Sequence, residues 1–203
     1  MRRFPRAAAG LALSVVLVTT SAVGAAQAAP PTQAAAATAT PQQSLVTKIK
    51  TIVTPFYTDA QLSQILTRLA ANVYDGKPLE ATFDSLFPSY VLTPNQTLAV
   101  LTLRAGVSRD LGSTAAIDKS YAASIRSAQA SYNQMLQKVA TMKRSGQSKA
   151  RCADAVYEIA SATLTSAKVE QTLKDLKAGL TAKEWQSLRT HGSAMFLWNL
   201  YRL

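Results

Sequence analysis

The feature that most constrains the fold is an apolar pattern in the middle of the chain. Its members follow one another at steps of three or four residues: Ile117, Tyr121, Ile125, Ala128, Tyr132, Met135, Val139 and Met142. Such steps place the side chains on one face of a helix. Because a helix rises about 1.5 Å per residue, the pattern predicts a helix of about 30 residues and roughly 45 Å.

A second apolar stripe follows the short polar segment 145–148. Its positions are Cys152, Val156, Ile159, Thr163, Val169, Leu173, Leu176 and Leu180. The stripe fits either one long helix or two helices that meet near Thr165. Two such stripes joined by a short polar turn predict an antiparallel hairpin. We therefore expect an all-α fold, a helical bundle built around this long hairpin.

Shorter helical patterns surround the predicted hairpin, and proline or glycine separates them. The first pattern runs from Leu45 to Val53 and stops before Pro55, and the next runs from Thr58 to Val73. Further patterns cover 79–86, 93–111 and 181 to near the C-terminus, with Gly112 as a terminator. Gly106 weakens the interior of its helix by roughly 1 kcal/mol relative to alanine.

The N-terminus has the three parts of a secretory signal. Arg2, Arg3 and Arg6 precede a short apolar stretch, 11–23, and Ala26-Gln27-Ala28 offers the small residues that a signal peptidase requires. We expect a signal peptide at 1–28, a flexible Ala/Pro/Thr linker at 29–41 and one helical domain at 42–203. The alternative is an uncleaved anchor. The predicted localisation is exported, either periplasmic or extracellular.

Positive charge is concentrated near the predicted hairpin turn. The chain has 22 Lys and Arg and 11 acidic residues, a net charge of +11, and cleavage at 28 would lower it to +8. No acidic residue lies from Lys119 to Ala153. The candidate partner-binding patch is Lys138, Lys143, Arg144, Lys149 and Arg151. It is either a docking site for an acidic client or anionic surface, or a solvated tip.

The residues needed for catalysis or metal binding are not grouped in the sequence. His191 is the single histidine, and zinc sites and Ser-His or Cys-His chemistry need more than one isolated imidazole. No glycine-rich phosphate loop exists among the 8 glycines. We therefore predict no catalytic, metal-binding or cofactor-binding residue. Cys152, the single cysteine, either bridges a homodimer or packs on a helix.

The C-terminal segment 194–203 is apolar on nearly every side. A helix of that kind is normally buried, so the segment is either part of the core or an exposed patch. As a patch it would bind a partner or lie on a membrane. Its candidate residues are Phe196, Trp198 and Tyr201.

One local pattern recurs at three predicted helix starts: Thr, two residues, then Gln or Glu. It occurs as Thr58 to Gln61, Thr93 to Gln96 and Thr181 to Glu184. The pattern is that of a capping box, in which the hydroxyl accepts from the third amide and the Gln or Glu bonds back. Losing one such cap costs about 1 kcal/mol.

With the apolar residues around it, this pattern resembles the LTxxQ motif of the Spy and CpxP family of bacterial periplasmic proteins. The resemblance lies in the segments 58–69 and 180–188. Tyr57 stands where that family has its first Leu, and Glu184 where it has its last Gln. The best-known members are cradle-shaped dimeric chaperones that need no ATP. The resemblance therefore implies chaperone-like binding of polypeptides.

These observations favour an exported, non-enzymatic protein that binds polypeptides or anionic envelope surfaces. One alternative is a secreted carrier of fatty acid or another apolar ligand, because amphipathic helices can open a cavity between them. A second alternative is a secreted effector or inhibitor that acts on another protein. No cofactor and no nucleic-acid partner is expected, and a homodimer remains an alternative to a monomer.

Overall fold

A computed structural model describes residues 39–52, 56–86 and 92–192, and every regular element in these residues is an α-helix. The helices are α2 (Pro41–Ile52), α3 (Asp59–Tyr74), α4 (Leu79–Leu86), α5 (Pro94–Leu111), α6 (Ala115–Arg144), α7 (Lys149–Thr163), α8 (Ser166–Ala178) and α9 (Ala182–His191). The predicted all-α class is confirmed.

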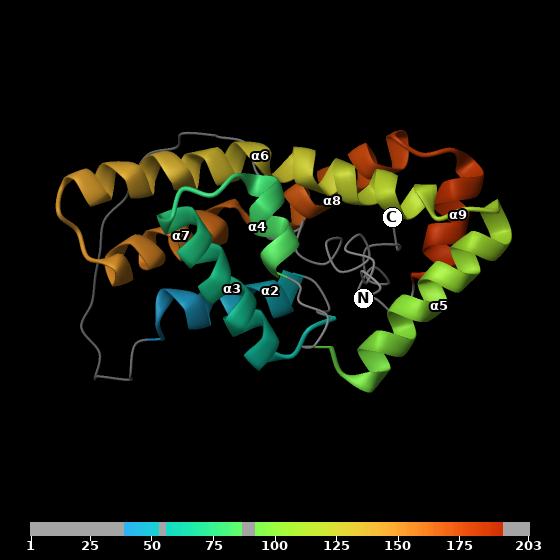
Figure 1. The fold of residues 1–203 in the computed structure, drawn as a ribbon, viewed down its shortest axis with the longest axis horizontal. Coiled ribbons are helices and arrows are strands. Elements are labelled where there is room, and N and C mark those ends of the chain that lie inside the picture. Colours follow the sequence, from blue (N-terminus) through green and yellow to red (C-terminus); the bar gives the residue numbers. More distant parts are fainter. Residues whose placement is uncertain (1–38, 53–55, 87–91, 193–203) are drawn as a thin grey trace.

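The 30-residue helix α6 runs along the long axis of the molecule (Figure 1). The chain turns at 145–148, and α7 and α8 then pack against α6. The break between α7 and α8 lies at Leu164 and Thr165, so the second apolar stripe forms two helices. Helices α2 and α3 pack against α7, and α4 packs against α3 and α6. Helices α5 and α9 pair with each other at the end of the molecule opposite the turn between α6 and α7 (Figure 1).

The three predicted capping boxes are present, and each hydroxyl accepts from the amide three residues on. The pairs are Thr58 with Gln61, Thr93 with Gln96, and Thr181 with Glu184. The structure also brings two of them together, 35 residues apart in sequence. The buried Gln61 and Gln96 amides bond to each other at 2.9 and 2.8 Å, so the starts of α3 and α5 meet.

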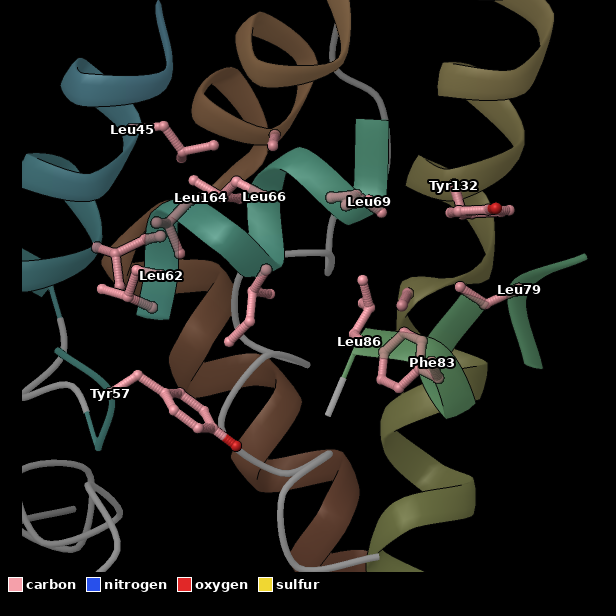
Figure 2. Close-up of a cluster of buried hydrophobic side chains, with 14 of the residues drawn as sticks. Leu45, Tyr57, Leu62, Leu66, Leu69, Leu79, Phe83, Leu86, Tyr132 and Leu164 are labelled. Carbon is pink, nitrogen blue, oxygen red and sulfur yellow. The ribbon is translucent and has the colours of Figure 1, made fainter. Parts of the chain in front are cut away.

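Large buried side chains of α3, α4 and α6 form the centre of the core (Figure 2). Leu66, Leu69, Phe83 and Tyr132 are fully buried. The Tyr132 hydroxyl contacts Thr82 Oγ1 at 2.6 Å and donates to the Lys77 carbonyl at 2.8 Å. Burial raises the pKa of Tyr132, and the Thr82 bond partly opposes that rise. The hydroxyl therefore stays neutral and ties α4 to α6.

Cys152 lies fully inside this core on α7. Of the two alternatives for this residue, the described structure therefore favours packing. A disulfide to a second copy would require α7 to move out of the core.

Several expectations fall on residues outside the described ranges. These are the signal peptide 1–28, nearly all of the linker 29–41, and the candidate patch Phe196, Trp198 and Tyr201. Among the described helices, none combines the length and the apolar character that a membrane crossing requires.

Candidate functional site

The five predicted cations lie around the turn between α6 and α7, and all five are exposed. We call this turn and its flanking residues, 138–151, the basic tip. Gly146 takes a φ of +72° in the turn, a conformation that a residue without Cβ adopts readily. Ser148 then starts α7, because its hydroxyl accepts from the Arg151 amide at 3.2 Å. The basic residues at these two helix ends therefore lie close to the turn.

Two of the five cations rest on Tyr74, the last residue of α3. The Lys143 ammonium lies 4.3 Å from the centre of the Tyr74 ring and donates to the Tyr74 carbonyl at 2.8 Å. The Lys149 ammonium lies 5.4 Å from the same ring. The face of an aromatic ring attracts a cation, and so does the carbonyl end of a helix, which carries partial negative charge. Lys143 and Lys149 therefore hold the basic tip in contact with the end of α3.

The other three cations make no comparable contact with α3. Arg144 folds back along α6, where its guanidinium bonds the Ala140 carbonyl and the Thr141 hydroxyl at 3.4 and 3.3 Å. Lys138 and Arg151 are exposed. None of the five cations forms an ion pair with a carboxylate in the described part of the chain. Their charge is therefore available to an external anion.

The placement of Lys149 and Arg151 opposes the dipole of α7. Both lie in the first turn of the helix, which has no acidic residue. The N-terminal end of a helix carries partial positive charge, so each cation there costs about 0.3 to 1 kcal/mol. Sequences break such local rules mainly at functional sites. The arrangement concentrates positive potential at the tip instead of lowering it.

An open groove of about 460 Å³ adjoins the basic tip between α6 and α7. Its lining is Gln134, Gln137, Lys138, Thr141, Ala155, Glu158 and Ile159. The side-chain amides of Gln134 and Gln137 can donate to and accept from a peptide backbone, whereas the Thr141 hydroxyl already donates to the Gln137 carbonyl at 3.0 Å. Ala155 and Ile159 supply a small apolar surface. The groove suits an extended polypeptide better than a fatty acid because it is open, whereas pockets for apolar ligands enclose most of the ligand surface.

A second polar cluster lies at the opposite end of the molecule, between α5 and α9. Asp110 Oδ2 accepts from Ser187 Oγ at 2.9 Å and lies 2.8 Å from His191 Nε2. Both hydrogen bonds lower the pKa of Asp110, and the bond with His191 contributes the larger part. Serine and histidine both bond the carboxylate and are not bonded to each other in the described contacts. The geometry is therefore not that of a serine nucleophile activated by histidine.

The Gly106 position explains how His191 fits at this end. A Cβ added at Gly106 would overlap the His191 ring. The sequence indicates Gly106 only as a weak point in a helix, whereas the structure shows that its missing side chain admits the imidazole. Among the described residues, no group of three His, Cys, Asp or Glu side chains could hold a metal ion.

Sequence reasoning found the five cations of the basic tip but missed Tyr74 beneath two of them. No local signal marks Tyr74, because it stands 69 residues before Lys143 and meets it only in the folded chain. The groove was also missed, since its residues come from two helices whose register the sequence does not fix.

In the comparison with known proteins, residues 12–192 match the family described as uncharacterized protein B0228.1-like. No curated protein and no solved structure matches the chain.

Proposed function

We propose that this chain, which belongs to the B0228.1-like family, is an exported, non-enzymatic protein that binds polypeptides in a chaperone-like manner. The surface that would bind them is the basic tip together with the adjoining groove. Acidic residues of an extended segment would meet the cations, and its backbone would bond the amide groups of the groove. The α6–α7 hairpin would serve as the rigid support for this surface.

The observation that carries the proposal is the unpaired charge of the basic tip. Five exposed cations gather within 14 residues, none is neutralised by a described carboxylate, and two of them stand against the dipole of α7. Solubility alone requires neither the absence of ion pairs nor the position of two cations against the dipole of α7. Cationic surfaces attract anionic partners and speed their encounter.

Two further features support the same proposal. The segments 58–69 and 180–188, each with a capping box, resemble the LTxxQ motif, which agrees with the chaperone-like form of the function. The signal-like N-terminus agrees with export. The lipid-carrier alternative receives less support, because the groove is open and five of its seven lining side chains carry a polar amide, a hydroxyl or a charge.

The test uses a variant that removes charge without touching Tyr74: Lys138→Gln, Arg144→Gln and Arg151→Gln. The chain from Ala29 onward holds every described helix and is the form to measure. Binding of a fluorescent peptide of alternating Glu and Phe is followed by anisotropy at low and high salt. At roughly 0.5 kcal/mol for each exposed charge, the variant should bind about tenfold more weakly.

A matched control removes the same charge elsewhere: Arg126→Gln, Lys174→Gln and Lys183→Gln, all exposed in the structure. Its affinity should stay within about twofold of the unmodified chain, because screening limits distant charges. Equal weakening in both variants would show that net charge, and not the basic tip, attracts the peptide. Unchanged binding in the tip variant would overturn the proposal.

A further inference from the structure

Helix α5 carries apolar side chains on two opposite faces. One face packs inward through Ala99, Val100, Leu103 and Val107, all of which are buried. The other bears Leu98, Leu101 and Ala105 at steps of three and four residues, all exposed. We call these three the outer stripe. Leu98 is 63% exposed and Leu101 is 51% exposed, and they are the exposed large apolar residues of the described chain.

The position of α5 leaves this stripe accessible. Figure 1 shows α5 at the end of the molecule opposite the turn between α6 and α7. Its inner face is occupied by α9, through the contact of His191 with Gly106. The outer stripe is therefore distant from the basic tip, and a partner bound there would leave the tip free.

The charges beside the outer stripe select the kind of partner. Arg104 and Arg109 lie on either side of it and are exposed. The acidic residue on α5, Asp110, is already bonded to Ser187 and His191, and Arg109 lies 3.6 Å from it. A second copy of the chain would bring like charges together across the interface, which opposes dimerisation through this face. An apolar stripe between cations instead fits an anionic lipid surface.

We propose that α5 docks on an anionic bilayer, with Leu98 and Leu101 entering the headgroup boundary and Arg104 and Arg109 contacting lipid phosphates or carboxylates. Two leucines give a shallow, reversible attachment and not a span of the membrane. The basic tip, at the far end of α6, would then point away from the lipid contact. This site goes beyond the polypeptide-binding function and does not depend on it.

The experiment is co-sedimentation of the chain from Ala29 onward with phosphatidylcholine vesicles, with and without phosphatidylserine. The unmodified chain should bind the anionic vesicles and bind the neutral ones several-fold less. The variant Leu98→Gln/Leu101→Gln should lose at least about tenfold in binding, because the replaced side chains carry the apolar contact. Both positions are exposed, so helicity by circular dichroism should be unchanged.

The matched control is Thr102→Gln/Ser108→Gln, two exposed polar positions on the same helix. It should bind anionic vesicles within about twofold of the unmodified chain. Equal binding by the Leu98→Gln/Leu101→Gln variant would overturn the proposal. A change in native mass of that variant, with vesicle binding retained, would assign the stripe to a protein contact. Loss of binding only on deletion of 193–203 would assign the lipid contact to the C-terminal segment and also overturn it.

Discussion

The two ends of the molecule combine apolar and polar chemistry in opposite ways. At the basic tip, charge lies outside, and the apolar side chains of Val139 and of the adjoining Cys152 are buried. At the α5–α9 end, a carboxylate, a hydroxyl and an imidazole bond one helix to the other, while leucines lie outside. The tip should therefore tolerate changes of its surface, whereas the α5–α9 end depends on specific contacts between its helices.

The largest effect should come from the shared core between these ends. Met135→Ala on α6 removes a fully buried side chain, and we expect a loss of about 2 to 5 kcal/mol in the free energy of unfolding. Urea denaturation followed by circular dichroism measures it. Gln137→Ala, an exposed change on the same helix, should stay within about 0.5 kcal/mol. A loss below 1 kcal/mol for Met135→Ala would contradict the packing described for α6.

A smaller loss in the free energy of unfolding is expected from a change at the α5–α9 end. Gly106→Ala places a Cβ in the volume of the His191 ring, so α9 must shift at a cost of about 1 to 3 kcal/mol. His191→Ala vacates that volume. The double variant should therefore cost less than the sum of the two single changes, by at least about 0.5 kcal/mol. Strict additivity in this cycle would show that the glycine and the histidine are not in contact.

Acidification tests a bond between α6 and α9. Glu184 Oε1 lies 2.6 Å from the Lys119 ammonium, and this bond, with one from the Thr181 amide, lowers the pKa of Glu184 from near 4.5 to about 2. A lowered carboxyl pKa contributes stability that is present above the unfolded value and is lost as the pH falls through the folded value. The unmodified chain should thus lose more stability than Glu184→Gln between pH 4.5 and about 2. Parallel pH profiles would exclude the bond.

The smallest effect on stability should come from the basic tip. Lys138→Gln/Arg144→Gln/Arg151→Gln should change the free energy of unfolding by less than about 0.5 kcal/mol, because the side chains are exposed. Removing Arg151 from the first turn of α7 should even stabilise slightly at low salt. Urea titrations at two salt concentrations measure both effects. A loss above 1 kcal/mol would mean that these cations support the fold.

The sequence predicted the helices well because their signals are local. A capping threonine precedes α3, α5 and α9, and Gly76 and Gly112 follow helices with a positive φ. The contacts between helices were not predictable in the same way. The Gln61–Gln96 pair, the Tyr74 ring under Lys143 and the His191–Asp110 bond each join residues more than 30 positions apart.

The candidate site was predictable in part for the same reason. A run without acidic residues identified the five cations of the basic tip directly. The groove beside them, and the two-faced character of α5, needed the packing of the helices. Leu98 and Leu101 are three residues apart, as on one helix face, and only the structure shows that this face lies on the solvent side of α5.

The most direct test of the proposed function is to locate the bound peptide. Amide chemical shifts of the labelled chain from Ala29 onward, titrated with the Glu–Phe peptide, report each residue separately. We expect perturbed amides in 134–159 and at Tyr74, with α5 unaffected. Perturbations confined to α5 and α9, or none at saturating peptide, would contradict the assignment of polypeptide binding to the basic tip and its groove.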